Sequence, residues 1–447
     1  MEVLFCLIKL SQRLTHERIT ALKNHPYWWE TVPRPAPAAG TRNLEPGRFD
    51  IAVIGAGYTG LSAAHHLARS GASVVVLERG QVGSGASSRN AGQVLTGLKV
   101  DPATLVARYG ESRARALFQV SRDSIAALES LVADERIECG LERTGHLQAA
   151  AKPSHFAAFR EEQALLDRVF DHQVSLVAPA AQATELATDS YYGLMVDEGS
   201  RAINPAQYVQ GLAAAARRAG AVVAEETPVM RIARDGREWT IATDRGAFRA
   251  NDVLLATNGY TDAAAPALQR RLIPIGSYII ATEPLPAAVA ARLLPRRRMV
   301  FDSKHFLHYF RLTADNRLLF GGRAEFSRPT PESAARASAI LRRGLAQVFP
   351  DLADTPIEYA WSGHVGFTRD QMPHAGLLDG LFYAGGYCGH GIAMATHLGA
   401  LIARRIAGER LDHPLFDDHF APIPLYYGRP WFLPLAGLYY QLRDWID

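Results

Sequence analysis

The chain has 447 residues, of which 48% are hydrophobic and 21% are charged, the usage of an ordinary folded protein rather than of a disordered or fibrous one. Its 48 basic and 45 acidic residues leave a formal net charge of +3, which is too balanced for the positive field that nucleic-acid binding needs. Cys6, Cys139 and Cys388 are too few and too scattered for a disulfide framework or a metal site, so we expect neither, and we expect a cytoplasmic location.

The two ends of the chain are predicted to lie outside the main folded body. Residues 1–48 are expected to form an N-terminal extension and linker, because residues 33–46 are rich in proline and small residues. Residues 413–447 are expected to form an aromatic C-terminal tail, whose uncharged run 430–442 is shorter than the ~20 residues needed to cross a bilayer. We therefore expect this tail to pack on its own domain rather than in a membrane.

After the linker, the chain predicts a strand, a helix and a second strand in close succession. Residues 50–54 (DIAVI) form a short apolar run, and residues 58–70 place Leu61 and Leu67 on one face of a helix. Residues 73–77 (SVVVL) form a β-branched run that is typical of a strand buried on both faces of a parallel sheet. Together these segments predict a βαβ unit.

The rest of the chain predicts a return to the first domain and a second, antiparallel domain. We expect the first domain to comprise residues 49–140, 196–262 and 362–412, and the second to comprise 141–195 and 263–361. The further predicted helices are 102–133, 153–170, 204–220 and 392–407, and the further predicted strands are 144–150, 222–232, 253–256, 273–282, 307–312, 318–321 and 381–384.

Three glycines lie between the first predicted strand and the helix that follows it. Gly55 permits a tight turn, Gly57 lets a pyrophosphate approach the backbone, and Gly60 allows close packing of helix on strand. Glu78 ends the next strand, where a carboxylate accepts hydrogen bonds from ribose hydroxyls. The pattern favours FAD or NAD over NADP, and its alternative is a glycine turn with a purely structural role.

Two further glycine-rich segments favour FAD over NAD. Residues 83–93 (GSGASSRNAGQ) would offer backbone N–H groups, Ser87 and Arg89 to a longer cofactor, although a flexible surface loop has the same composition. Residues 385–391 (GGYCGHG) precede a helix whose N-terminus would stabilise negative charge on a reduced flavin. The alternative for this second segment is a plain connection between a strand and a helix.

In these segments the chain resembles the FAD-dependent D-amino-acid oxidase and glycine oxidase superfamily, and within it is most similar to bacterial gamma-glutamylputrescine oxidases. The resemblance covers residue 50 to the C-terminus and includes residues 82–93, 308–323, 359–373, 389–391 and the tail LYYQLRDW. It implies an α/β fold with a Rossmann-like (GR2-type) FAD-binding domain and an α+β substrate domain with an antiparallel sheet. The residues expected to bind FAD are Gly55, Gly57, Gly60, Glu78, Arg79, Ser87, Arg89, Asn90, Gly92, Val229, Asn258, Gly259, Gly389, Gly391 and Ile392.

Departures from the wider superfamily bear on the substrate. Glycine-oxidase-like members carry a carboxylate-binding arginine after a motif that here reads Trp-Ser-Gly-His and is followed by Val365. Sarcosine-oxidase-like members carry a lysine where this chain has Ala393. A buried carboxylate without a partner costs several kcal/mol, so the resemblance favours an amine that has no carboxylate on the reacting carbon. It also implies dissociable FAD, with a covalent link through Cys388 as the alternative.

The predicted reaction is oxidation of an amine C–N bond by hydride transfer to flavin N5, followed by hydrolysis of the imine and reoxidation by oxygen. The leading substrate is gamma-glutamylputrescine. The expected catalytic residues are His390, Tyr309 and His364, and the expected substrate-binding residues are Trp361, Tyr387 and Arg311. Core packing is the alternative for the aromatic residues, a structural hydrogen bond for the histidines, and pairing within the sheet for Arg311.

Three rival functions and one open question remain from the sequence alone. The enzymatic rivals are a D-amino-acid dehydrogenase that passes electrons to a quinone, docking on a membrane through the tail, and a plain NAD dehydrogenase. The rival of another class is an FAD-binding protein without turnover. The sequence gives no oligomeric state.

Overall fold

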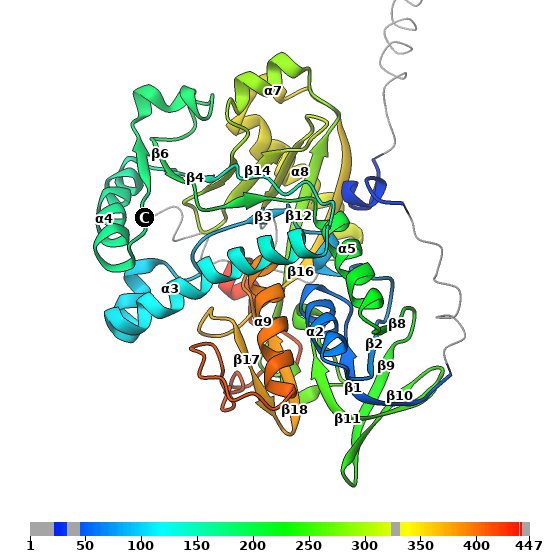
Figure 1. The fold of residues 1–447 in the computed structure, drawn as a ribbon. Helices are drawn as coiled ribbons and strands as arrows, with labels where there is room; N and C mark the ends of the chain where they lie inside the picture. The colour runs from blue at the N-terminus through cyan, green and yellow to red at the C-terminus, as the bar shows by residue number, and fades with distance from the viewer. Residues whose placement is uncertain (1–21, 34–44, 323–330, 438, 440–447) are drawn as a thin grey trace, which may run out of the picture.

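The computed structural model describes residues 22–33, 45–322, 331–437 and 439. The linker residues 34–44 and most of the tail segment LYYQLRDW therefore lie outside the described residues, as do residues 1–21 and Arg323. Two eight-stranded sheets dominate the described part, and in Figure 1 one sheet lies above the other. The two-domain organisation expected from the sequence is thus present.

The first sheet has a parallel core with β11 and β1 at its centre. The expected helix between β1 and β2 is α2 (Tyr58–Arg69), which confirms the βαβ unit. The strands of the path β17-β18-β11-β1-β2-β8 are all parallel to their neighbours except β17. Their bounds are β1 (Arg48–Ile54), β2 (Val74–Leu77), β8 (Val222–Ala224), β11 (Gly246–Leu255), β17 (His374–Leu378) and β18 (Leu381–Gly385).

Helices cover one face of this sheet because their apolar sides are buried against it and against one another. The helix α2 packs between α5 (Pro205–Arg218) and α9 (Gly391–Ile406), and α9 also packs on α3 (Pro102–Asp134), as Figure 1 shows. The helix α5 begins where expected, since the side chain of Asn204 accepts hydrogen bonds from the N–H groups of the first turn. The long α3 is kinked at Gly110, which has a φ of 75°.

The segment 222–232, which the sequence predicts as one strand, forms two strands in different pairings. The strand β8 ends at Ala224 and extends the parallel sheet beside β2, whereas β9 (Val229–Asp235) forms an antiparallel pair with β10 (Glu238–Thr243). The break falls at Glu226, whose φ of 50° is incompatible with a continuing strand. Apolar composition alone did not mark this turn.

The second sheet is mainly antiparallel, with β13 and β4 as a parallel pair. Its core is built from residues such as Phe310 and Phe320, whose stacked rings lie 5.6 Å apart, under α8 (Pro331–Val348). The other helices of this half are α4 (Pro153–Phe170) and α7 (Ala287–Leu293). The strand order is β16 (Ile357–Phe367), β12 (Ile273–Thr282), β15 (Leu318–Gly322), β14 (His308–Leu312), β13 (Met299–Asp302), β4 (His146–Ala149), β6 (Leu194–Asp197) and β5 (Ser175–Val177).

Two of the expected domain boundaries fall inside strands of this second sheet. The strand β16 pairs with β12 along its length, as far as Phe367 opposite Ile273, so it crosses the boundary expected between residues 361 and 362. The strand β6 pairs with β4 from Leu194 to Asp197 and crosses the boundary expected between 195 and 196. Both boundaries are corrected by the hydrogen-bond ladders, which place these strands wholly in the second sheet.

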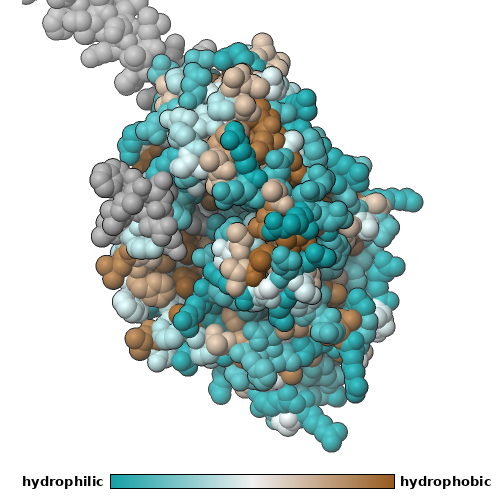
Figure 2. Space-filling view, turned by 90° about the vertical axis from the view of Figure 1, so that its left-hand side faces the viewer, coloured by the Kyte–Doolittle hydropathy of each residue, from teal (hydrophilic) through white to brown (hydrophobic). Residues whose placement is uncertain are grey.

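Parts of both chain ends are packed against the folded body. Residues 22–33 contact the second sheet, where Trp28 is 2% exposed, so the N-terminal 48 residues are more than an extension and a linker. Leu433 in the C-terminal tail is buried, while Trp431 and Leu435 are exposed. Figure 2 shows a mostly hydrophilic face on which apolar residues form separate patches. Within the described part of the chain, no helix combines the length and the apolarity that crossing a membrane requires.

Candidate active site

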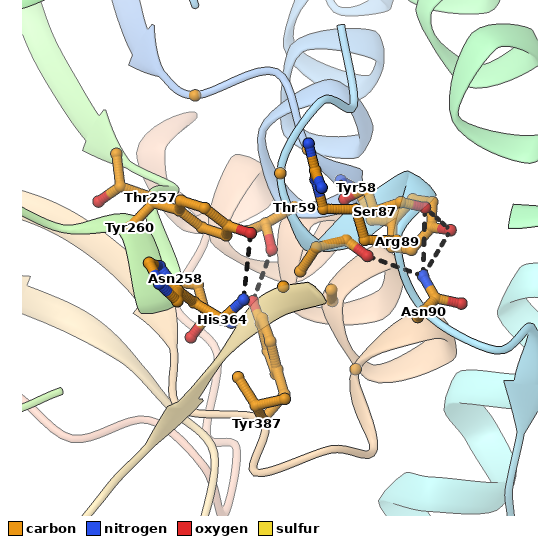
Figure 3. A pocket seen from close by; sticks show the side chains of 18 of the residues that line it. Tyr58, Thr59, Ser87, Arg89, Asn90, Thr257, Asn258, Tyr260, His364 and Tyr387 are labelled. Atoms are coloured by element: carbon orange, nitrogen blue, oxygen red, sulfur yellow. Dashed lines mark hydrogen bonds between the residues drawn. The ribbon is translucent and has the colours of Figure 1, made fainter. Parts of the chain in front are cut away.

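A cavity of about 490 Å³ lies between the two sheets. One part of its lining follows the carboxyl ends of β1, β2 and β11, where open parallel sheets characteristically bind their ligands. Another part comes from β12, β14 and β16 of the second sheet, and α9 begins beside it. Figure 3 shows side chains from both parts converging on the same space. The cavity therefore joins a dinucleotide crevice to a chamber on the second sheet.

The three motif glycines bring bare backbone to the cavity and pack α2 against β1. Gly55 has a φ of 105°, and a Cβ there would lie 3.1 Å from the carbonyl oxygen of Ala256. A Cβ on Gly57 would lie 3.0 Å from Ser87 Oγ. Gly60 does not line the cavity, but a Cβ on it would lie only 2.0 Å from the carbonyl oxygen of Gly55. These positions agree with the separate roles expected for the three glycines.

Glu78 stands at the end of β2 and lines the cavity. Its Oε2 accepts a hydrogen bond from the Ala56 N–H at 2.8 Å, and its Oε1 accepts one from the Gly80 N–H at 2.9 Å. The neighbouring Arg79 also lines the cavity and forms an ion pair with Asp262. Val229 lines the same cavity, so the residues expected to meet the adenosine share one lining.

Residues 83–93, which we call the cofactor loop, form a large part of the cavity wall. The N–H of Tyr58 donates to Ser87 Oγ at 3.2 Å, and the Tyr58 hydroxyl donates to the Ser87 carbonyl (Figure 3). Asn90 Nδ2 donates to the Ala86 carbonyl at 2.9 Å, and Asn90 Oδ1 accepts from the Gly92 N–H at 2.8 Å. The loop is therefore internally bonded rather than a flexible surface segment.

Gly92 and Gly259 were expected to touch the cofactor, but the structure places neither in the cavity lining. Gly92 has a φ of 71°, and a Cβ there would lie 2.1 Å from the carbonyl oxygen of Ile203. A Cβ on Gly259 would lie 2.9 Å from the N of Gly366. Both glycines allow backbones to approach one another closely, behind the wall of the cavity.

The second glycine-rich turn brings the N-terminus of α9 to the cavity. Gly389, His390, Gly391 and Ile392 all line it, and the His390 N–H donates to the Tyr387 carbonyl at 2.9 Å. The aligned peptide dipoles of a helix favour negative charge at this end. The Tyr387 hydroxyl is hydrogen-bonded to Thr59 Oγ1 at 2.6 Å, and burial raises the pKa of Tyr387, so this side chain is a neutral part of the wall.

Cys388 also lines the cavity and is held as a thiol. Its Sγ donates to the Gly386 carbonyl at 3.1 Å. Burial raises the pKa of Cys388 to about 11, although a contact with Thr368 and the charge of Lys99 oppose that rise. Because the thiolate is the nucleophilic form of cysteine, this environment disfavours covalent attachment.

Asn258, Tyr260 and His364 form one side of the chamber. Asn258 has a φ of 42°, and its Oδ1 accepts a hydrogen bond from the Gly386 N–H at 2.9 Å. The rings of Tyr260 and His364 lie 4.9 Å apart, and the His364 N–H donates to the Tyr260 hydroxyl at 3.2 Å (Figure 3). His364 therefore belongs to the cavity as expected, while Tyr260 is a cavity residue that the sequence analysis did not select.

Tyr309 lies on the second sheet and lines the chamber together with Ile275, Leu307 and Phe301. Its hydroxyl is hydrogen-bonded to Ser277 Oγ at 2.9 Å. The wall here is mostly apolar and aromatic, with the Tyr309–Ser277 pair as a polar group within it. Tyr309, His364, His390 and Tyr387 are thus brought together, as the sequence analysis expected.

Arg311 does not line the cavity, which corrects its expected role in substrate binding. It is 8% exposed, and its NH1 donates to the carbonyls of Gly92 at 2.8 Å and Ile203 at 3.1 Å. Burial lowers the pKa of Arg311 to about 10. Its guanidinium therefore satisfies backbone carbonyls outside its own sheet, a structural role that differs from the pairing within the sheet left open above.

Trp361 does not line the cavity either, so it does not form the substrate wall that we expected. It is 3% exposed, and its indole N–H donates to the Arg89 carbonyl at 2.8 Å. Residues 363, 365 and 367 lie on one face of β16 and do line the cavity. Trp361 lies on the same face two residues earlier, beyond the edge of the cavity. Its contact with the cofactor loop is considered again below.

Other lining residues were also missed, among them Ser277 and Lys99. Ser277 occupies a position of β12 that alternation places toward the chamber, and a lone serine in an apolar strand was the available signal. Lys99 follows the cofactor loop, and no local motif distinguishes it. The charge of Lys99 opposes the rise that burial causes in the pKa of Cys388.

The cavity fits an extended adenine dinucleotide. Gly57 supplies bare backbone at the N-terminus of α2, and the cofactor loop and the turn before α9 extend the lining away from it. Glu78, expected to bind a ribose, and Val229, expected to meet an adenine, both line this cavity. Among the described residues, no group of His, Cys, Asp or Glu side chains could hold a metal ion.

This fold and cavity define a flavin-dependent oxidoreductase. Residues 50–405 match the family of FAD-dependent oxidoreductases, and the chain belongs to that family. Its cofactor is FAD. The chain is 35% identical to gamma-glutamylputrescine oxidoreductase of Escherichia coli over 88% of this chain and 92% of that protein. It is 27% identical to glycine oxidase of Geobacillus kaustophilus, over 80% of this chain and 92% of the enzyme.

The solved structures agree with this assignment of the fold. The crystal structure of glycine oxidase from Geobacillus kaustophilus superposes with a TM-score of 0.70 at 23% identity. The superposition covers 82% of this chain and 96% of the glycine oxidase chain. The expected α/β architecture, with an FAD-binding domain and a second domain built on an antiparallel sheet, is therefore confirmed.

Proposed function

We propose that this enzyme oxidises the C–N bond of an amine that has no carboxylate on its reacting carbon. The observation that carries the proposal is the chamber wall formed by Ile275, Leu307, Tyr309 and Val365, which is apolar and aromatic around the Tyr309–Ser277 hydrogen bond. Val365 stands where the resemblance to glycine oxidases places a carboxylate-binding arginine. The nearby Arg311 cannot replace that arginine, because its guanidinium is bonded to backbone carbonyls.

FAD, when bound, accepts the hydride from the carbon that bears the amine. The chain's own residues would prepare the amine for this loss. A mostly apolar wall disfavours the ammonium form, and so lowers the pKa of the bound amine toward neutrality. We infer that His364 or His390 accepts the amine proton, and that Tyr309 orients the substrate through its hydroxyl. Water then converts the imine to an aldehyde and releases ammonia or a smaller amine.

Gamma-glutamylputrescine is the leading substrate. The relative from Escherichia coli, 35% identical to this chain, is a gamma-glutamylputrescine oxidoreductase. That molecule carries a primary amine at one end and a carboxylate far from it at the other. We infer that Lys99 meets the distal carboxylate, since it is a cationic residue of the cavity lining. Its positive charge would also disfavour the ammonium form of the reacting amine.

Oxygen is the proposed electron acceptor, with hydrogen peroxide as its product. The cysteine at position 388 is held as a thiol, so we propose that FAD is bound without a covalent link. Denaturing the protein should therefore release FAD into the supernatant. A cytoplasmic location remains a prediction of the sequence.

The deciding experiment mixes the purified holoenzyme anaerobically with single amines and follows the flavin spectrum. Gamma-glutamylputrescine should bleach the flavin faster than putrescine, glycine or D-alanine. Bleaching by D-alanine alone would instead indicate the D-amino-acid dehydrogenase. A spectrum unchanged by all of these amines would contradict the proposal and favour an FAD-binding protein without turnover. Oxygen uptake by the bleached enzyme then separates oxygen from a quinone as the acceptor.

A further inference from the structure

Residues 22–33, which we call the N-terminal strap, are anchored on the edge of the second sheet. The Lys23 N–H donates to the Glu358 carbonyl at 2.8 Å, and the Ala360 N–H donates to the Lys23 carbonyl at 3.0 Å. The Tyr27 hydroxyl donates to Asp315 Oδ1 at 2.8 Å. The strap is therefore fixed to β16 and to the turn between β14 and β15.

From this anchor the strap reaches the cofactor loop. Trp28 Nε1 donates to the Asn90 carbonyl at 2.8 Å, and Trp29 Nε1 donates to Ser88 Oγ at 2.7 Å. Trp361 Nε1, from β16, donates to the carbonyl of the residue between them, Arg89, at 2.8 Å. Three indole N–H groups thus hold three consecutive residues of the loop from outside the cavity.

Arg89 is oriented by the same arrangement. Its guanidinium lies 4.8 Å from the centre of the Trp29 ring. Its Nε donates to the Ser84 carbonyl at 2.7 Å, and its NH1 donates to the Ser362 carbonyl at 3.0 Å. Arg89 lines the cavity, whereas no described residue of the strap does. The strap therefore acts on the cavity only through the loop.

The far end of the strap is fixed to α5. Asn204 Nδ2 donates to Thr31 Oγ1 at 2.8 Å, and Gln207 Nε2 donates to the Thr31 carbonyl at 3.3 Å. The strap consequently connects the second sheet, the cofactor loop and a helix of the first domain. A segment of this kind can restrict the loop while remaining outside the site.

We propose that the N-terminal strap is a positioning element for FAD, and that Trp28 and Trp29 hold the cofactor loop in its binding conformation. The loop is rich in glycine and small residues, and ordering a backbone residue costs about 1–2 kcal/mol. A loop that is ordered before FAD binds saves that free energy on binding. Trp28 and Trp29 are positioning residues in this scheme, since they touch neither the cavity nor the reacting atoms.

The test uses the full chain with Trp28→Phe and Trp29→Phe, which keep a ring and remove the N–H. A matched control is Trp239→Phe, because the indole nitrogen of Trp239 is buried without a hydrogen-bond partner among the described residues. The readouts are the FAD dissociation constant, measured by flavin fluorescence on folded apoprotein, and the circular dichroism of the bound flavin. If each hydrogen bond contributes a net free energy of about 0.5–1.5 kcal/mol, each strap variant should bind FAD about 2- to 12-fold more weakly than the wild type. The affinity of the control variant for FAD should be unchanged.

A second variant keeps the proposal testable if a strap variant fails to fold. Ser88→Ala removes the acceptor of the Trp29 bond, and Ser88 does not line the cavity. Ser88→Ala should weaken FAD binding, and the pair Trp29→Phe and Ser88→Ala should be less than additive. Strap variants that bind FAD as tightly as Trp239→Phe, with an unchanged flavin signal, would overturn the proposal. Full additivity of the pair would overturn the role given to the Trp29 bond.

Discussion

The ring of Tyr309 lies over the backbone of Gly321, its partner in the antiparallel pair of β14 and β15. A Cβ on Gly321 would meet the ring at 2.3 Å, so only glycine leaves room for the ring in this position. The hydroxyl of Tyr309 is thereby brought to Ser277 on β12. The chamber wall consequently depends on a residue that does not itself line it.

Replacing Gly321 with alanine should displace Tyr309 and lower kcat/KM for the amine substrate by about tenfold, equivalent to about 1.4 kcal/mol. FAD content should stay unchanged, because Gly321 belongs to the second sheet and does not line the cavity. Steady-state kinetics and flavin absorbance check both parts. The matched variant Tyr309→Phe keeps the ring over Gly321 and should lose less activity. Wild-type kcat/KM in Gly321→Ala would refute the importance of the ring's position.

Lys99→Met should raise KM for gamma-glutamylputrescine by at least about tenfold, because a charge-assisted hydrogen bond is worth about 1.5–3 kcal/mol. KM for putrescine, which carries no carboxylate, should rise far less. The comparison of the two substrates in one variant serves as its own control. An equal rise for both substrates would mean that Lys99 does not bind the distal carboxylate.

Gly57→Ala should weaken FAD binding while the protein still folds. The added Cβ would lie 3.0 Å from Ser87 Oγ, in a part of the cavity lining where the backbone is otherwise bare. Adding Ser87→Gly removes that contact and should restore part of the affinity. Equilibrium dialysis of FAD against each apoprotein measures the effect. If Ser87→Gly restored none of the affinity for FAD, the contact with Ser87 would not be the cause of the weaker binding.

Arg311→Met should lower the free energy of unfolding by about 1–3 kcal/mol, because it leaves buried carbonyls without their donor. In the fraction that folds, KM for gamma-glutamylputrescine should be close to that of the wild type. Chemical denaturation and steady-state kinetics on the holoenzyme separate the two effects. A rise in KM without any loss of stability would restore Arg311 as a substrate residue.

Stability should decrease as the pH falls below about 6.5, in part through His413. Burial and the neighbouring His397 lower the pKa of His413 from 6.5 to about 4, although Asp123 and Asp412 oppose this. The unfolded chain therefore binds more protons than the folded chain between these pH values, so the contribution of His413 is complete above pH 6.5 and is lost toward pH 4.

The variant His413→Gln tests this contribution. Its free energy of unfolding should fall less steeply than that of the wild type between pH 7 and pH 5, as urea denaturation at several pH values would show. The side chain of Gln can still accept the Leu415 N–H, which bonds to His413 Nδ1 at 3.3 Å. If the free energy of unfolding fell equally steeply in the wild type and in His413→Gln, the pH dependence would belong to other groups.

The dinucleotide crevice was predictable from the sequence because it is encoded locally. Strand, glycine turn, helix and acidic residue follow one another within thirty residues or so, and each has a physical requirement that few residue types meet. Tyr309, His364, His390 and Tyr387 were also placed in the cavity correctly. The residues that carried the resemblance were therefore enough to predict the class of reaction.

What could not be predicted depends on contacts between distant segments. Arg311 and Tyr309 share a face of β14, and only the register with the rest of the fold shows that Arg311 lies behind the cavity wall. Trp361 is likewise separated from the lining residues of β16 by its position along the strand. The role of Trp28 and Trp29 requires a segment near the N-terminus to reach a loop about 60 residues later, as the sequence separation of 62 for the Trp28–Asn90 bond shows.

The long pairing of β12 with β16 keeps one wall of the cavity in a single piece. This ladder continues without interruption from Tyr359 opposite Ala281 to Phe367 opposite Ile273, and both strands contribute residues to the cavity lining. Because both strands belong to the second sheet, a hinge motion that parted the two sheets would carry the whole ladder with it and break none of its hydrogen bonds. The chamber wall built on these two strands would therefore keep its shape during such a motion, while its distance from the dinucleotide crevice changed.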